Sequence, residues 1–210
     1  GIRCVAHPDP TDGLAIAKLI SSYKVTIMCG TSTFFRLYTK NQKIHSLMFE
    51  SLRLVVSGAE KLREDVRIEF KKRFAKDILE GFGTTETSPV ATCNLPDVLS
   101  PDFSIQKGQK AGTVGMAIPG TTIKVVDPVT FKELKVNEEG MILISGIQVM
   151  KSYLDDEDRT KKALKVINAK TYYITGDKGK LDEDGFLTIV DRYSRFAKIG
   201  GEMISLGAIE

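Results

Sequence analysis

The sequence predicts an α/β protein in which a parallel α/β layer is followed by a small antiparallel, β-barrel-like subdomain. Two observations indicate the first part. Strand-like and helix-like runs alternate over the first half of the chain, and the apolar residues of its clearest helix recur every fourth residue. The second part is indicated by short strand-like runs that follow one another, with turn sequences between them, after a glycine-rich stretch at 108–120.

The first expected element is a helix near the N-terminus. Asp9 is expected to be its N-cap, with Pro10 at the first helical position and Asp12 three residues after the cap. A short buried strand over 25–29 and a helical stretch over 34–38 are expected to follow.

The clearest helix follows an expected strand over 52–57. An apolar stripe marks one face of this helix and consists of Leu62, Val66, Phe70 and Phe74. A basic run near its C-terminal end suits the helix dipole and is expected to be a solvated face; it consists of Lys71, Lys72, Arg73 and Lys76. Because a short strand over 77–80 comes next, the strand–helix–strand order predicts a parallel sheet.

The second half contains four strand-like runs and one helical run. The strands are expected at 121–127, 141–145, 172–175 and 186–191, and the helix at 156–166. The α/β part is therefore expected to cover 1–112, and the barrel-like part 113–191.

Composition excludes several classes of protein. The chain is 42% hydrophobic and 27% charged, which is typical of a soluble globular protein. Its net charge of +3 comes from 30 basic and 27 acidic residues that are mixed along the chain, so no nucleic-acid-binding stripe is expected. No apolar run reaches the length of about 18 residues that a membrane-spanning helix needs. The chain starts without Met and stops directly after a glycine-rich turn, so both ends are expected to be cuts within a longer protein.

Three widely spaced cysteines and two isolated histidines give no zinc or disulfide pattern. A reducing, cytoplasmic setting is therefore expected. Cys29 lies in an apolar run and is expected to be a small buried residue rather than a nucleophile.

The first candidate site is the turn Gly81-Phe82-Gly83-Thr84-Thr85-Glu86-Thr87. Backbone N–H groups and hydroxyls in such a turn can approach a phosphate, and Glu86 could hold Mg²⁺. Phe82 could stack on a base. Ordinary turn chemistry explains the same residues equally well, and no Walker lysine follows.

Two further motifs carry polar groups near strands. In Tyr173-Ile174-Thr175-Gly176-Asp177, the Asp177 carboxylate could accept both hydroxyls of a ribose, or it could be a simple turn residue. In the loop from 191 to 202, Arg192 could pair with phosphate or ribose, and Gly200-Gly201 would allow a close backbone approach. In isolation this loop would be only a polar loop.

The order of the motifs closely resembles the adenylate-forming superfamily, which includes acyl-CoA synthetases, adenylation domains and luciferases. The motifs are Ser57-Gly58-Ala59-Glu60, Gly81-Phe82-Gly83-Thr84-Thr85-Glu86, Gly112-Thr113-Val114-Gly115 with Pro119-Gly120, Thr175-Gly176-Asp177, and Asp191-Arg192 with Lys198-Ile199-Gly200-Gly201. The segments 7–12, 29–34 and 190–196 resemble one branch more closely. That branch is the synthetase part of the bacterial bifunctional 2-acylglycerophosphoethanolamine acyltransferase/acyl-acyl-carrier-protein synthetase.

The resemblance implies ATP, AMP and Mg²⁺ as cofactors and a role for each motif. Gly58, Ala59 and Glu60 would line the adenine site, beside Phe82. Gly83 and Thr84 would also bind the nucleotide. Thr85 would contact the α-phosphate, Glu86 would hold Mg²⁺, Asp177 would bind the ribose, and Arg192 would contact ribose or phosphates. The catalytic set is therefore Thr85, Glu86 and Arg192.

The resemblance also implies partners and an architecture. The chain would belong to the large N-terminal domain of such an enzyme, with 192–210 as a hinge and the start of a truncated C-terminal domain. A fatty acid would be activated and passed to acyl carrier protein, or to coenzyme A, in lysophospholipid reacylation. The parent protein would be membrane-associated through another domain, at the cytoplasmic face of the bacterial inner membrane.

Two departures from the superfamily pattern concern the hinge. Asp191 stands where Gly is usual, and Ser194 stands at the usual hinge position. Lys198 and Gly200-Gly201-Glu202 would approach the thiol. The segment 31–35 could form an acyl-pocket wall, although Phe34 and Phe35 are equally explained as core residues.

The superfamily's phosphate loop and its late lysine are absent from the sequence. The chain alone is therefore expected to be inactive, with weak AMP affinity at most. A coenzyme A ligase, a peptide-synthetase adenylation domain and a non-catalytic docking module remain alternatives.

Overall fold

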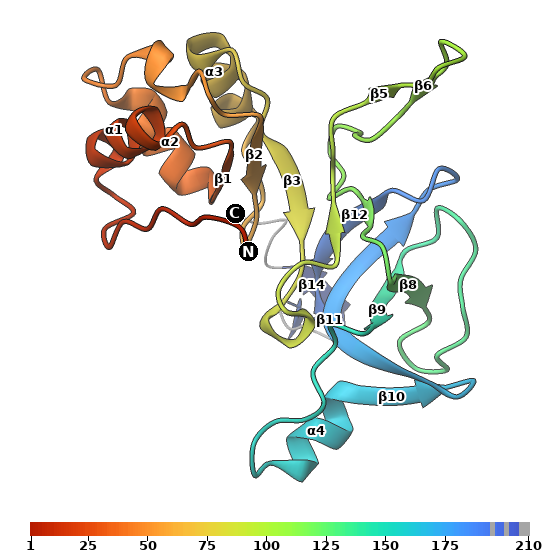
Figure 1. Cartoon of the computed structure of the whole chain (residues 1–210). Coiled ribbons are helices and arrows are strands. Elements are labelled where there is room, and N and C mark those ends of the chain that lie inside the picture. The colour runs from red at the N-terminus through yellow and green to blue at the C-terminus, as the bar shows by residue number, and fades with distance from the viewer. Residues whose placement is uncertain (194–195, 200–201, 206–210) are drawn as a thin grey trace. The chain divides into compact units, whose positions relative to one another are not determined.

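The computed structural model describes residues 1–193, 196–199 and 202–205. The chain forms two compact units, Gly1–Gly81 and Phe82–Glu210, which are described separately (Figure 1). This division lies earlier in the chain than the boundary expected near 112. The division into 1–112, 113–191 and 192–210, which concerns subdomains of a larger enzyme, stays a prediction.

The first unit alternates helices and strands, as the sequence predicts. Its elements are α1 (Gly13–Tyr23), β1 (Ile27–Gly30), α2 (Ser32–Lys40), the 3₁₀ helix η1 (Ser46–Phe49), β2 (Leu54–Ser57), α3 (Glu64–Phe74) and β3 (Leu79–Phe82). Strands β1 and β2 pair in parallel, and β2 and β3 also pair in parallel. The predicted parallel α/β layer is therefore confirmed.

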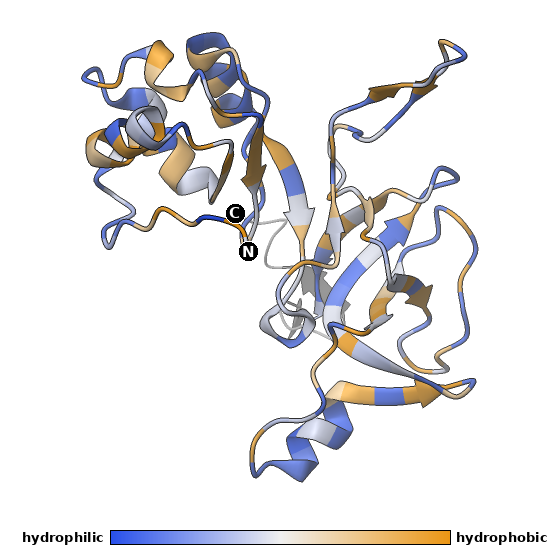
Figure 2. Ribbon diagram, viewed as in Figure 1, coloured by the Kyte–Doolittle hydropathy of each residue, from blue (hydrophilic) through white to orange (hydrophobic). Residues whose placement is uncertain are grey.

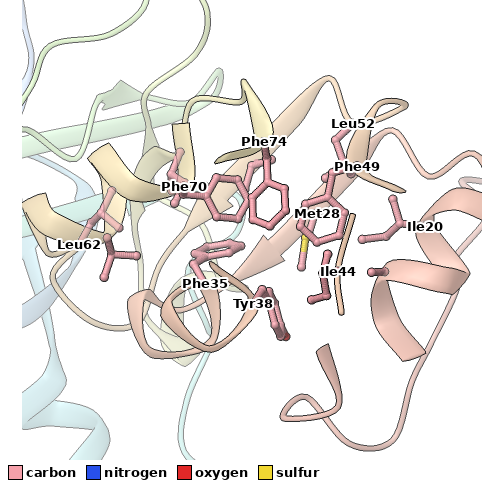
Figure 3. Packing of buried hydrophobic residues seen from close by; sticks show 14 residues of the cluster. Ile20, Met28, Phe35, Tyr38, Ile44, Phe49, Leu52, Leu62, Phe70 and Phe74 are labelled. Atoms are coloured by element: carbon pink, nitrogen blue, oxygen red, sulfur yellow. The ribbon is translucent and has the colours of Figure 1, made fainter. Parts of the chain in front are cut away.

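Aromatic side chains form the centre of the core in this unit (Figure 3). The Phe35 and Phe70 rings lie 5.4 Å apart, centroid to centroid, and the Phe49 and Phe74 rings lie 4.6 Å apart. Val66, Phe70 and Phe74 of the predicted stripe are all buried on α3. The four-residue spacing thus identified the buried face of this helix correctly.

The first helix begins later than the sequence suggested. The N-cap is Asp12, whose carboxylate accepts the N–H of Ala15 at 3.0 Å. The Asp9 carboxylate instead accepts the N–H of Thr11 at 2.8 Å. The expected N-cap at Asp9 is wrong, because this carboxylate closes a local turn before the helix starts.

The strand β1 is also less buried than expected. Met28 faces the core, but Ile27 is 50% exposed and Cys29 is exposed. Alternate residues of a strand point to opposite faces, so only every second side chain of this apolar run enters the core. The expectation that Cys29 is buried is therefore wrong.

The basic run at the end of α3 is only partly a solvated face. Lys71 and Lys72 are exposed. Arg73, however, donates to the carbonyl oxygens of Thr39, Asn41 and Ile44. Lys76 Nζ donates to the carbonyl oxygens of Glu50 and Leu52 at 2.8 and 2.6 Å. Two of these four charges therefore bind backbone carbonyl oxygens at the end of α2 and in the segments that follow it.

The second unit is mainly antiparallel. Its elements are η2 (Thr85–Thr87), β4 (Thr92–Cys93), β5 (Val98–Leu99), β6 (Ile105–Gln106), β7 (Met116–Ala117), β8 (Thr121–Val126), β9 (Gly140–Gly146), α4 (Glu157–Ala163), β10 (Leu164–Ile167), β11 (Lys170–Leu181), β12 (Leu187–Arg192), β13 (Phe196–Ile199) and β14 (Glu202–Ser205). The main sheet has the order β10-β11-β9-β8, and β12 also pairs with β11. This curled antiparallel sheet confirms the predicted fold class, and Ile142, Ile144 and Leu187 form its core.

The expected helix over 156–166 is shorter in the structure. It ends at Ala163, and Leu164–Ile167 is the strand β10, which pairs antiparallel with β11. Figure 2 shows α4 as mostly hydrophilic and β10 as more hydrophobic. The β-branched residues Val166 and Ile167 fit a strand better than a helix. In the described part of the chain, no helix is long and apolar enough to cross a bilayer.

Candidate functional site

Asp177 and Arg192 are direct partners across β11 and β12 in the second unit. Arg192 Nε donates to Asp177 Oδ1 at 2.6 Å. Asp177 was expected on a turn after a strand, but β11 continues past it to Leu181. Gly176, with φ +75°, produces an irregularity in the strand just before Asp177, and the register with β9 shifts between Ile174 and Lys178.

The backbone of Asp177 is held by Thr175. The N–H of Asp177 donates to Thr175 Oγ1 at 3.0 Å, and Thr175 Oγ1 donates to the carbonyl of Ile142 at 2.9 Å. The side chain of Asp177 is only 6% exposed, whereas that of Arg192 is 55% exposed. Burial raises the pKa of Asp177, and the Arg192 guanidinium offsets that rise only in part.

The Gly-Thr turn is closed by internal hydrogen bonds. The N–H of Thr84 donates to Thr87 Oγ1 at 2.9 Å, and this hydroxyl donates to the carbonyl of Thr84 at 3.0 Å. A Cβ atom on Gly83 would lie 1.7 Å from the carbonyl oxygen of Pro89, so this position requires glycine. The turn therefore presents Thr85 and Glu86 from a fixed backbone.

Two groups from the segment before α4 hold Glu86. The hydroxyl of Tyr153 donates to Glu86 Oε1 at 2.6 Å. The N–H of Met150 donates to the backbone carbonyl of Glu86 at 2.8 Å. Burial raises the pKa of Glu86, but hydrogen bonds, that of Tyr153 foremost, outweigh burial and leave this pKa below its ordinary value. Glu86 is thus an ionised carboxylate at neutral pH.

The charged groups of the second unit share one electrostatic neighbourhood. Burial, followed by the charge of Glu86, raises the pKa of Tyr173 to about 12, so this phenol stays protonated. The pKa of Arg192 is raised first by Asp177 and further by Tyr173 and Glu86. The Glu86 carboxylate, the Arg192 guanidinium and the Asp177 carboxylate, which binds that guanidinium directly, therefore influence one another electrostatically.

Two other predicted residues of this unit differ in exposure. Thr85 is exposed on the turn. Phe82 is partly buried and packs against the apolar cluster that contains Ala91 and Ile142. Phe82 therefore contacts the core. Its expected stacking on a base remains a prediction.

The predicted adenine residues Gly58, Ala59 and Glu60 belong to the first unit. The Glu60 carboxylate accepts the N–H of Thr33 at 2.5 Å, which fastens the first turn of α2. Ala59 has φ +67°, an unfavourable conformation for alanine that often marks functional loops. Ser57 Oγ is buried with no hydrogen-bond partner among the described residues. The turn after β2 is therefore strained, and it follows an unsatisfied polar group.

A magnesium ion would have one protein carboxylate in this arrangement. Within the described ranges, no group of three or more His, Cys, Asp or Glu side chains could hold a metal. Mg²⁺ is commonly bound through one or two carboxylates together with substrate phosphates and water. Glu86, ionised and oriented, fits that mode.

Some expectations fall on other parts of the chain. Ser194, Gly200 and Gly201 lie outside the described residues. Lys198 lies on β13 and Glu202 on β14. In the proposed pocket segment 31–35, Phe35 is a core residue with no exposed surface.

Sequence reasoning missed Tyr153. It lies 67 residues after Glu86 and belongs to no motif that the sequence singles out. Tyr173 stood inside a quoted motif without an assigned role. Only the folding of the segment before α4 against the Gly-Thr turn identifies Tyr153, whereas Tyr173 lies on β11.

Comparisons with known proteins identify the family to which the chain is similar. The model of a family described as AMP-binding enzyme matches residues 1–154. A long-chain-fatty-acid–CoA ligase of Yersinia pestis is 30% identical over 210 residues, which cover 100% of this chain and 35% of the relative. A probable 4-coumarate–CoA ligase 2 of Dictyostelium discoideum is 32% identical over 211 residues, which cover 99% and 36% of the two chains.

Solved structures of related enzymes have the same fold as this chain. ATP-bound MatB from Rhodopseudomonas palustris has a TM-score of 0.76 and 29% identity to this chain, with 95% of this chain and 37% of that one covered. The anthranilate CoA ligase AuaEII in complex with anthranoyl-AMP shares the fold, with a TM-score of 0.76 over 99% of this chain and 37% of that one, at 24% identity. The chain thus spans little more than a third of the length of these proteins.

Proposed function

The chain belongs to the AMP-binding enzyme family, and on that premise we propose that it is part of an ATP-dependent fatty-acid ligase. The enzyme would form acyl-AMP and pass the acyl group to the phosphopantetheine thiol of an acyl carrier protein. One observation carries the proposal. In the second unit, an ionised Glu86 interacts electrostatically with Arg192, which is hydrogen-bonded to Asp177. A carboxylate suits Mg²⁺ and a guanidinium suits phosphate, so these groups would be able to bind a magnesium nucleotide.

In the first proposed step, a fatty-acid carboxylate oxygen attacks the α-phosphorus of ATP, a P–O bond forms, and pyrophosphate leaves. Bound Mg²⁺ would neutralise phosphate charge in this step. Glu86 would hold that ion, Thr85 would donate to the α-phosphate, and Arg192 would stabilise its developing charge. Asp177, fixed by Thr175, would accept the ribose hydroxyls and so orient the nucleotide.

In the second proposed step, the thiol attacks the acyl carbonyl, a thioester forms, and AMP leaves. The acceptor assignment is supported by the branch-like segments at 7–12, 29–34 and 190–196. The same resemblance supports a role in lysophospholipid reacylation, in a parent protein associated with the inner membrane.

Coenzyme A is the second candidate acceptor. It carries the same phosphopantetheine thiol, and the relatives named above are coenzyme A ligases. The alternative that is not an enzyme is a docking module, which would bind a partner protein without catalysing a reaction.

One assay separates these candidates. The complete protein that contains this chain is incubated with ATP, Mg²⁺ and a long-chain fatty acid, with acyl carrier protein and coenzyme A offered side by side. Acylation of the carrier protein alone supports the first candidate, and acylation of coenzyme A supports the second. Absence of both acylation and pyrophosphate release contradicts the enzymatic proposal and supports the docking module.

A further inference from the structure

We propose that Tyr153 is a positioning residue, whose hydroxyl fixes the Glu86 carboxylate in the orientation in which it binds the magnesium ion of the nucleotide. The inference rests on the proposed function, because it presupposes that Glu86 is the metal ligand. Tyr153 itself acts only through Glu86.

The first argument is the double attachment of Glu86 to one short segment. Tyr153 donates its hydroxyl hydrogen to Glu86 Oε1 at 2.6 Å. Met150, three residues earlier, donates its N–H to the carbonyl of Glu86 at 2.8 Å. Because the backbone and the side chain of Glu86 are both held, the carboxylate has little freedom to rotate away from its position.

The second argument is that Tyr153 is itself fixed by the start of α4. The N–H of Tyr153 donates to Thr160 Oγ1 at 2.9 Å. The guanidinium of Arg159 lies over the Tyr153 ring, 4.0 Å from its centroid. Arg159 is placed by the N-cap Asp156, whose carboxylate accepts its N–H at 2.9 Å. No residue of α4 is buried, and these polar contacts link its first turn to Tyr153.

The third argument concerns charge. A phenol orients a carboxylate without cancelling its negative charge, whereas Lys or Arg at the same place would compete with a bound cation. Tyr153 offers a neutral hydroxyl that donates to Glu86 Oε1 at 2.6 Å. A neutral donor is therefore suited to support a ligand for Mg²⁺.

The test compares Tyr153→Phe with a matched control in the complete protein. Tyr38→Phe is the control, because it also deletes one hydroxyl that donates a hydrogen bond, to the carbonyl of Pro10 at 2.7 Å, far from Glu86 in the sequence. Calorimetry measures the dissociation constant of ATP with and without Mg²⁺. Tyr153→Phe is expected to weaken Mg²⁺-dependent ATP binding about tenfold, since a hydrogen bond to a charged group is lost, and to leave metal-free ATP binding within about twofold. Tyr38→Phe is expected to change neither constant.

A second variant tests the same contact without removing the Tyr153 hydroxyl. Thr160→Val deletes the hydroxyl that accepts the N–H of Tyr153 and so loosens the backbone of Tyr153. It is expected to weaken Mg²⁺-dependent ATP binding in the same direction as Tyr153→Phe, with a smaller change. This second variant keeps the test available if Tyr153→Phe folds poorly.

Two results for Tyr153→Phe overturn the proposal. Unchanged Mg²⁺-dependent binding in Tyr153→Phe would do so, and so would equal weakening with and without metal, which indicates a merely structural role. Glu86→Gln distinguishes failure of the inference about Tyr153 from failure of the metal assignment of Glu86. If Glu86→Gln abolishes the Mg²⁺ dependence but Tyr153→Phe does not alter it, only the inference about Tyr153 fails. If Glu86→Gln leaves the dependence intact, the metal assignment of the proposed function fails as well.

Discussion

Arg192 lies directly opposite Asp177 across two antiparallel strands, and its Nε hydrogen-bonds a carboxylate that is almost completely buried. The two partners differ sharply in environment, because the guanidinium remains more than half exposed. A buried carboxylate that is only partly compensated is costly to the fold. It is therefore expected to serve binding rather than stability.

Asp177→Asn is expected to weaken AMP binding by about tenfold to a hundredfold, because a charged acceptor is lost. At pH 7 the variant is expected to unfold at the same or a higher temperature than the parent. The pKa of Asp177 is raised in the folded state, so the native state binds more protons and stability falls as pH rises through that pKa. Calorimetric titration and thermal unfolding measure both effects, and a Tm several degrees lower at pH 7 would contradict the argument.

Asp182→Asn is expected to lower the stability at pH 7, unlike Asp177→Asn. The Asp182 carboxylate accepts the N–H of Phe186 at 2.9 Å and pairs with Lys110. Burial raises its pKa, but these contacts outweigh burial and lower the pKa overall. Its stabilisation is therefore present above the unfolded-state pKa of about 3.9 and lost as pH falls through the lower, folded-state value. The variant is expected to lose about 1–2 kcal/mol at pH 7 in urea unfolding, and equal stability of variant and parent there would refute this.

Gly83→Ala is expected to destabilise the protein by about 1–3 kcal/mol and to weaken nucleotide binding. A Cβ there would meet the Pro89 carbonyl oxygen at 1.7 Å, so the turn that carries Glu86 must move. Gly58→Ala is the matched stability control, because its Cβ would lie 3.7 Å from the carbonyl oxygen of Gly81, an ordinary contact. Denaturant unfolding of both variants tests the prediction, which fails if they are equally stable.

Phe70→Ala is expected to cost about 3–5 kcal/mol of unfolding free energy, because it leaves a cavity in the aromatic core. Phe70 has no exposed surface and contacts the rings of Phe35, Phe49 and Phe74. Ile68→Ala on the same helix, at a side chain that is 54% exposed, is expected to change stability by less than about 0.5 kcal/mol. Urea unfolding monitored by circular dichroism distinguishes the two, and similar losses would argue against this core.

The fold class was predictable because each half carries a local pattern. The four-residue spacing through Val66, Phe70 and Phe74 marked the buried side of α3, and strand–turn repetition marked the antiparallel sheet. Predictions of individual side chains were weaker. The expected N-cap at Asp9 failed because two nearby carboxylates both suit a helix start, and only one caps it. Cys29 was expected to be buried because an apolar run does not reveal which strand face meets the core.

The sequence by itself determined the two kinds of sheet, the buried face of α3 and the order of the motifs that place the chain in its family. Tertiary structure alone decided that Tyr153 meets Glu86 and that Arg73 and Lys76 fasten loop carbonyls. It also decided that Asp177 faces Arg192 within the strands. The physical reason is range. Periodicity and turn chemistry act over a few residues, whereas strand register and loop packing decide which distant side chains come within hydrogen-bonding distance.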